Sequence, residues 1–199
     1  VLNLMNAASL NVQDVTIGAN STLGVFIGGD PTPETAKEGI LTVSGTLAAQ
    51  DAHSWLNANL VMDKDSVLDV SGTGGAGLAM GSSVTLNPGV TLSAGDMAAI
   101  TALGFMDQYT LFTGVDAFSY DGSTPTSTPI AFDSETWVKA SEVFSNSAFT
   151  GGKDYYVFYS GAQNGSNVGA VYVMQLPEPT TGTLSLLALA ALAARRRRK

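Results

Sequence analysis

Cysteine is absent from this sequence, and histidine occurs once, at His53. Without cysteine, these 199 residues have no disulfide bond, no thiolate metal ligand and no cysteine nucleophile. A single histidine also excludes a metal site built from several imidazoles. Chemistry within this chain therefore has to come from carboxylates, hydroxyls, aromatic rings or the backbone.

Positive charge is scarce too, and most of it lies at one end. Charged residues make up 13% of the chain, against roughly 25% in an ordinary soluble domain. Five of the nine Lys and Arg residues are the last five, so the residues before them carry four basic groups against 17 acidic ones, a net charge of −13. Phosphate backbones repel a body this acidic, which excludes nucleic acid as a partner.

The C-terminal residues form three successive parts: the break Pro177-Glu178-Pro179, an uncharged stretch, and a basic end. The prolines lack a backbone donor and favour an extended residue before them, so the preceding element ends here. As a helix, residues 180–194 reach about 22 Å, which is shorter than the ~30 Å hydrocarbon core of a bilayer. The basic end suits the cytoplasmic side of a membrane. It consists of Arg195, Arg196, Arg197, Arg198 and Lys199.

This order of Pro177-Glu178-Pro179, apolar helix and terminal arginine cluster resembles the PEP-CTERM sorting signal of Gram-negative surface and extracellular proteins. That signal is also catalogued as the ice-binding protein C-terminal motif. The resemblance covers about residues 176–199. It implies an exosortase as processing partner, transient anchoring in the membrane through the C-terminal helix, and delivery to the cell surface, the outer membrane or the extracellular matrix. A plain tail anchor is the alternative.

Export of residues 1–176 requires an N-terminal signal. The chain begins Val1-Leu2-Asn3, with neither an initiator Met nor a basic segment. We therefore expect an export signal, and further repeats, upstream of Val1.

Residues 1–92 contain short apolar runs separated by Gly, Asn, Asp and Ser. The runs at 10–12, 15–17, 40–43, 67–70, 84–86 and 90–92 alternate with a period of two, as half-buried strands do. The hexad LTVSGT at 41–46 recurs as LDVSGT at 68–73, and residues 17–25 resemble residues 62–70. Repeats of this length favour stacked coils, so we predict an all-β fold with a partial parallel β-solenoid; a β-sandwich is the alternative. The pattern is similar to the passenger regions of autotransporter-type adhesins.

Residues 93–176 are predicted to form a small β unit that caps the solenoid. Ser93 and Asp96 fit a capping box at the start of a short helix over 95–103, with Gly104 as its stop. Strands are expected over 108–114, 137–144, 155–159 and 168–174, the last two as a hairpin, with loops at 121–129 and 161–167. The aromatic residues of 155–159 are interpreted as cross-strand packing, with an exposed ligand-binding patch as the alternative. Residues 177–199 follow as the third part, which contains the C-terminal apolar helix.

Asp63, Asp65 and Asp69 form the densest group of carboxylates. A Ca²⁺ site is one interpretation of this group, and ordinary turn chemistry is the favoured one. The glycine-rich residues 72–77 satisfy G-x-G-x-x-G, but no helix is expected after them, which favours a turn over a nucleotide site. Asp51, His53 and Ser54 are too close in sequence to converge as a catalytic triad. We therefore predict no catalytic residue, and no cofactor apart from that possible Ca²⁺.

These observations predict an exported, surface-associated structural or adhesive protein that contacts extracellular polysaccharide and is not an enzyme. The alternative is a polysaccharide lyase or glycosidase on the same scaffold. Such an enzyme needs carboxylates and aromatic rings that converge in a groove.

Overall fold

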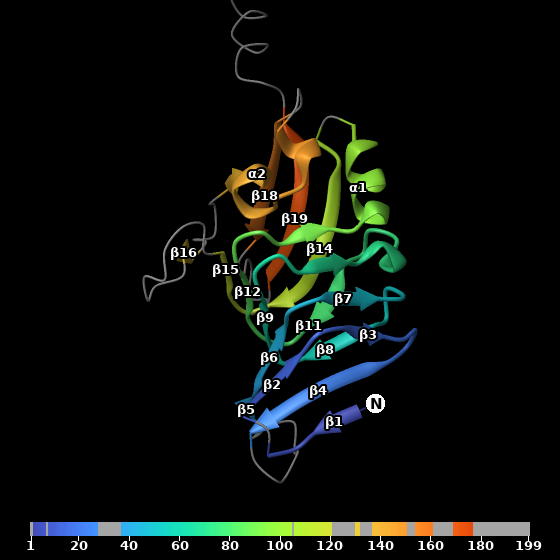
Figure 1. The fold of residues 1–199 in the computed structure, drawn as a ribbon. Helices are drawn as coiled ribbons and strands as arrows, with labels where there is room; N and C mark the ends of the chain where they lie inside the picture. The colour runs from blue at the N-terminus through green and yellow to red at the C-terminus, as the bar shows by residue number, and fades with distance from the viewer. Residues whose placement is uncertain are drawn as a thin grey trace, which may run out of the picture.

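The computed structural model of this chain describes residues 2–6, 8–27, 37–104, 106–120, 130–131, 137–150, 154–160 and 169–176 (Figure 1). Within these residues β-strands predominate, and most neighbouring strands run parallel. The predicted all-β class is therefore confirmed. The described strands form three sheets, which we call A, B and C.

From residue 2 to residue 120 the chain passes through the three sheets in the order A, B, C, and each pass adds a strand beside the strand of the previous pass; the strands after residue 120 join sheets B and A antiparallel. We call one such pass a circuit. Sheet A contains, in spatial order, β1 (Leu2–Leu4), β4 (Thr22–Ile27), β8 (Trp55–Asn57), β11 (Leu78–Met80), β14 (Gln108–Val115), β19 (Gly169–Leu176), β18 (Asp154–Ser160) and β17 (Trp137–Lys139), and β5 (Lys37–Glu38) pairs with β4. Sheet B contains β2 (Ser9–Val12), β6 (Ile40–Val43), β9 (Asn59–Met62), β12 (Val84–Leu86), β15 (Phe118–Tyr120) and β16 (Ile130–Ala131). Sheet C contains β3 (Val15–Ile17), β7 (Thr46–Ala49), β10 (Val67–Asp69) and β13 (Thr91–Leu92).

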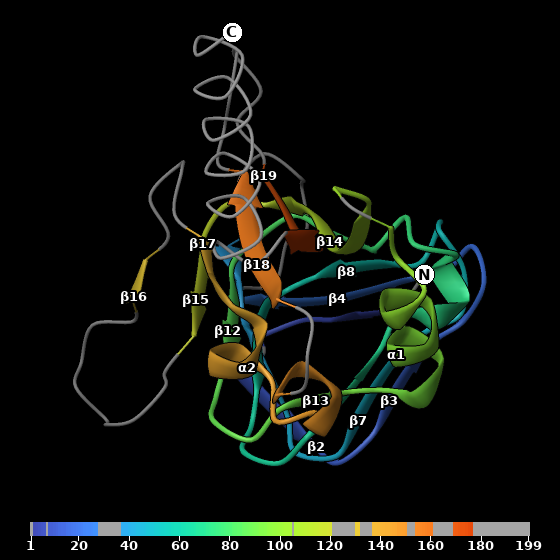
Figure 2. The same ribbon diagram turned by 90° about the horizontal axis from the view of Figure 1, so that it is seen from above.

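The three sheets surround a common interior, which Figure 2 shows along the stack. Apolar side chains fill this interior and stack in columns from one circuit to the next. In sheet B the column is Leu10, Leu41, Leu60, Val84 and Phe118, each paired with the next. Full burial of one such side chain stabilises the fold by roughly 1.5–3 kcal/mol. The other two sheets add the columns Leu23, Leu56 and Met80 in sheet A and Val15, Leu47, Leu68 and Leu92 in sheet C.

The sequence repeats do not mark equivalent positions in these columns. Leu41 lies in sheet B and pairs with Leu10 and Leu60, whereas Leu68, its counterpart in the repeated hexad, lies in sheet C. Successive members of the sheet B column are 31, 19, 24 and 34 residues apart. Each circuit needs only an apolar residue at the inward position, so its turns vary in length and a constant sequence period does not arise.

The six strands predicted before residue 92 are present, but the sequence did not indicate β1, β4, β5, β7, β8, β9 or β11. Residues 40–43 and 84–86 are strands β6 and β12, and the other predicted runs before residue 92 differ from the observed strands by one residue at most. Helix α1 (Ala94–Thr101) begins where the capping box placed it, because the Ser93 hydroxyl accepts a hydrogen bond from the Asp96 N–H. A 3₁₀ turn, η1 (Ser71–Thr73), precedes the glycine-rich segment.

The parallel pairing continues past residue 92. Strand β14 pairs with β11, and β15 pairs with β12, both in parallel. The hairpin of β18 and β19 then joins β14 antiparallel, which confirms the predicted hairpin. The helices α1 and α2 (Ala140–Val143) lie at the end of the stack away from the N-terminus (Figure 1), and the 3₁₀ turn η2 (Ser147–Thr150) follows α2.

The strand predicted over 137–144 is only partly correct. It ends at Lys139, the last residue of β17, and α2 takes the next four residues. Ala140 and Val143 are both buried, a spacing that fits one turn of helix better than alternation. The predicted loops at 121–129 and 161–167 and the C-terminal apolar helix lie outside the described residues.

Among the helices that the structure describes, none has the length and apolar character needed to cross a bilayer.

Candidate functional site

The structure does not bring Asp63, Asp65 and Asp69 together as a metal site. Asp63 and Asp65 belong to the turn between β9 and β10, where the Asp63 carboxylate accepts the Lys64 N–H at 2.8 Å and its carbonyl accepts the Ser66 hydroxyl at 2.7 Å. Asp69 ends β10 and accepts the Ser71 hydroxyl at 2.6 Å. Across the described ranges, no three His, Cys, Asp or Glu side chains are grouped closely enough to hold a metal ion. The turn interpretation accounts for the first two aspartates.

The glycine-rich segment is also a turn. Gly74, Gly75 and Gly77 have positive φ values of 64°, 87° and 80°, and strand β11 follows directly at Leu78. Because no helix N-terminus follows these glycines, the segment lacks the geometry that binds phosphate groups. It connects sheet C to sheet A.

Asp51, His53 and Ser54 occupy the turn before β8. The Asp51 carboxylate accepts the backbone N–H groups of Asn20 and His53, at 3.1 and 2.9 Å, and the Ser54 hydroxyl at 3.2 Å. Burial alone raises the pKa of Asp51, but these hydrogen bonds outweigh it and hold the pKa below its usual value. Asp51 therefore fastens one turn to the turn of the preceding circuit, as expected of a residue that stabilises structure.

The sorting residues Pro177, Glu178 and Pro179 and the basic end 195–199 lie outside the described residues. The last described residue is Leu176, which is also the last residue of β19. The described strands therefore extend to the residue before Pro177.

A buried carboxyl, Asp96, joins α1 to two of the sheets. It accepts the Tyr109 hydroxyl at 2.7 Å, the Ser93 hydroxyl at 2.8 Å and the Val70 N–H at 3.1 Å. Asp96 is 0% exposed and Tyr109 5%. The same Ser93 hydroxyl lies 3.0 Å from the Asp69 carboxylate, so its single proton is shared between two acceptors.

The pKa values of these groups shift in opposite directions. Burial raises the pKa of Asp96, and the hydrogen bonds from Tyr109, Ser93 and Val70 offset that rise only in part. For the more exposed Asp69 the hydrogen bonds from Ser71 and Ser93 outweigh burial and lower the pKa. The sequence revealed Ser93 and Asp96 only as a helix cap, because the contact with Tyr109 requires the chain to return after α1.

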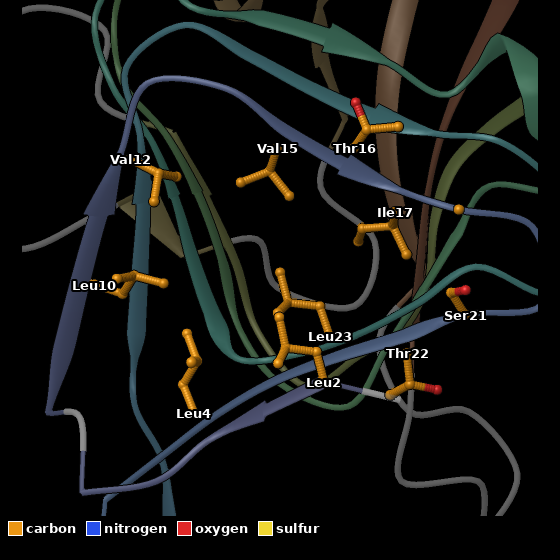
Figure 3. Close-up of a pocket in the computed structure, with 11 residues that line it drawn as sticks. Leu2, Leu4, Leu10, Val12, Val15, Thr16, Ile17, Ser21, Thr22 and Leu23 are labelled. Atoms are coloured by element: carbon orange, nitrogen blue, oxygen red, sulfur yellow. The ribbon is translucent and has the colours of Figure 1, made fainter.

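The end of the stack formed by β1, β2 and β3 is open. These three strands are the terminal strands of their sheets in the described chain, and the first circuit encloses a cavity of about 450 Å³ (Figure 3). The cavity walls are mainly apolar, include Thr16, Ser21 and Thr22, and carry no charged side chain. They include Leu2, Leu4, Leu10, Val12, Val15, Ile17 and Leu23.

On the outer face of sheet A, the large ring of Trp55 lies between small side chains of the adjacent strands. Trp55 is 46% exposed, and it points away from the core because its neighbour Leu56 is fully buried. Register places Trp55 beside Thr22 on one side and Ala79 on the other, and the same row continues over the next strands. We call this set the outer row; it comprises Thr22, Trp55, Ala79, Thr113, Ala170 and Ser160.

Two further aromatic rings border this row. Phe158 and Tyr172 face each other across the hairpin, with ring centroids 5.4 Å apart and planes 5° apart, and both are partly exposed. Each lies two residues along its strand from a member of the outer row. The sequence indicated this aromatic cluster at 155–159 but not Trp55, whose neighbours come from other circuits.

Comparisons with protein-family models, with curated proteins and with solved structures found no match to this chain.

Proposed function

We propose that this chain is an exported protein retained at the cell surface, with a parallel β-solenoid body and a PEP-CTERM-type sorting tail at residues 177–199. The observation that carries the proposal is the position of the tail. Pro177-Glu178-Pro179, the uncharged stretch and the five basic residues begin immediately after β19 ends at Leu176. A signal to be removed must lie where cleavage leaves the fold intact, and this position meets that condition.

The solenoid body is supported by the fixed A, B, C order of the strands and by the buried columns that connect successive circuits. In such an architecture each circuit packs only on its neighbours, which yields a long body with flat outer faces. Flat, extended faces are suited to contact with an extended partner. A structural or adhesive role at the surface, with extracellular polysaccharide as partner, therefore fits this body.

The alternative of a polysaccharide lyase or glycosidase has less support. It depends on converging carboxylates, and Asp63, Asp65 and Asp69 do not converge. The enzyme alternative would regain support if the chain turned over a polysaccharide and if Asp65→Asn or Asp69→Asn abolished that turnover.

The sorting proposal is tested by fusing residues 177–199 to a reporter exported by its own signal. We expect removal of the tail, seen by intact mass, in cells with exosortase and retention of the intact tail in cells without it. Pro177→Ala combined with Pro179→Ala is the matched variant, which changes the break but keeps the apolar stretch and the charge. The same retention of the intact tail in both cell types would overturn the proposal.

A further inference from the structure

We infer that the outer row of sheet A binds a neutral polysaccharide, with a pyranose ring stacked on Trp55 and the glycan chain lying across the strands. The inference rests on the proposed function, since it assigns the surface through which that protein contacts its polysaccharide. It is argued from the exposure of Trp55, the size of its neighbours, the polar groups beside it and the charge of the row.

The exposure of Trp55 is the first argument. A tryptophan side chain has one of the largest apolar surfaces of any residue, and leaving it in water costs free energy that a ligand can recover. Here the ring is kept open because Thr22 and Ala79, its partners in adjacent strands, are too small to cover it. A pyranose ring presents a face of C–H groups that packs on such a flat aromatic surface.

The second argument is the polar edge of the ring. A Cβ added at Gly81 would lie 3.9 Å from the Trp55 Nε1 and 3.3 Å from the Asn57 Oδ1. The indole N–H and the Asn57 amide therefore border the same space, which exists because residue 81 has no side chain. Neither group has a hydrogen-bond partner among the residues that the structure describes. A donor beside an amide matches the hydroxyl groups around a sugar ring.

The third argument is the small size of the side chains that continue the outer row beyond Trp55. Ala79, Thr113, Ala170 and Ser160 follow one another across four strands and are all partly exposed. With a strand spacing of about 4.8 Å, the distance from β8 to β18 is about 19 Å. This is room for several sugar units on a surface whose row members beyond Trp55 all have small side chains. Phe158 and Tyr172 form its border on the hairpin.

Charge decides the class of polysaccharide. The outer row contains no charged residue, although the chain before its basic end carries −13. A polyanion would approach this acidic body against repulsion and find no cation in the row. A neutral chain meets neither difficulty, so the surface favours uncharged glycans.

The test is a binding measurement with the full chain. The probes are microcrystalline cellulose and chitin as neutral solids, alginate as a polyanion, and soluble hexasaccharides of the two neutral glycans. Variants are Trp55→Ala, which removes the ring, and Ala79→Lys, which places a long charged side chain in the outer row. Ile40→Ala is the matched control, because Ile40 is a 43% exposed apolar residue on sheet B.

We expect the unchanged chain to bind at least one neutral probe, with affinity retained in 1 M salt and no binding to alginate. Trp55→Ala and Ala79→Lys should each weaken binding about tenfold or more, a loss typical of a central aromatic contact. Ile40→Ala should bind as the unchanged chain does. In a Trp137→Phe background, Trp55 is the sole tryptophan, and its emission should shift on addition of the hexasaccharide.

Three results would overturn the inference: no binding to any neutral probe, equal binding by Trp55→Ala, or salt-sensitive binding to alginate alone. Melting curves of all variants show whether a loss of binding reflects loss of the fold. If binding survives in Trp55→Ala, the outer row is not the binding site. The proposed function as an exported surface protein is not affected by that result, because it is tested separately by the removal of the sorting tail.

Discussion

Replacing Tyr109 with Phe tests the buried contact between α1 and sheet A. The change deletes one hydroxyl, 2.7 Å from the Asp96 carboxyl, and leaves the buried ring in place. A hydrogen bond to a charged group contributes roughly 1.5–3 kcal/mol, and one between neutral groups roughly 0.5–1.5 kcal/mol. We therefore expect a loss of about 2 kcal/mol when Asp96 is ionised and about 1 kcal/mol when it is neutral.

The pH dependence follows from the pKa of Asp96. Because the folded pKa is raised, this carboxyl contributes stability that is fully present below its ordinary pKa of 3.8 and is lost as the pH rises through the folded value. The Tyr109 hydroxyl lowers the pKa of Asp96, so its removal raises that pKa further. The variant should therefore be more destabilised at pH 8 than at pH 3.5.

The measurement is urea unfolding followed by circular dichroism at both pH values. A loss of about 2 kcal/mol corresponds to a fall in Tm of roughly 4–8 °C for a domain of this size. Tyr159→Phe is the control, since the Tyr159 hydroxyl contacts backbone carbonyls of Val115 and Asp116 and its loss should change little with pH. Equal destabilisation of Tyr109→Phe at pH 8 and pH 3.5 would refute the assignment of a raised pKa to Asp96.

Three further predictions concern the body. In urea unfolding, Gly114→Ala should destabilise the fold by more than about 2 kcal/mol, because φ is 72° and the new Cβ would meet a backbone carbonyl of β11. Gly74→Ala is the control: its φ is 64° but its Cβ would lie in open space, so it should cost about 1 kcal/mol. Leu68→Ala, at a fully buried position, should cost about 2–5 kcal/mol, and Leu2→Ala, at a 59% exposed one, less than about 0.5 kcal/mol in the same assay. Calcium at millimolar concentration should leave the melting temperature unchanged relative to chelator, and a rise that Asp65→Asn abolishes would contradict the turn interpretation.

Local patterns in the sequence predicted six of the strands before residue 92 and the helix start, because those features depend on adjacent residues, but they missed the sheet A strands β4, β8 and β11. Alternation over 40–43 and the Ser93 cap are of this kind. The pairing of circuits depends on which inward-facing residues lie side by side in adjacent strands. Leu41 pairs with Leu60, 19 residues later, and no other step of the sheet B column has that spacing. For that reason the two copies of the hexad do not occupy equivalent positions, since one lies in sheet B and the other in sheet C.

The same distinction applies to the site. Trp55 is unremarkable in its local sequence, and its significance depends on Thr22 and Ala79, which come from the circuits before and after it. Asp96 likewise has two roles: the sequence predicted its place in the helix cap but not its contact with Tyr109. Sites that combine residues from neighbouring circuits can be predicted only when the pairing of the strands is known.

The stacking of the circuits has a mechanical consequence. When residues 2–176 are held at β19 and pulled at β1, the load reaches the first described circuit before the others. Each circuit contacts mainly its neighbours, so the circuits should detach one at a time from the β1 end. With 19 to 34 residues between successive column positions, each step would release about 65–120 Å of chain at about 3.5 Å per residue. The body would then extend in steps under tension, while the outer row nearest the hairpin stays folded longest.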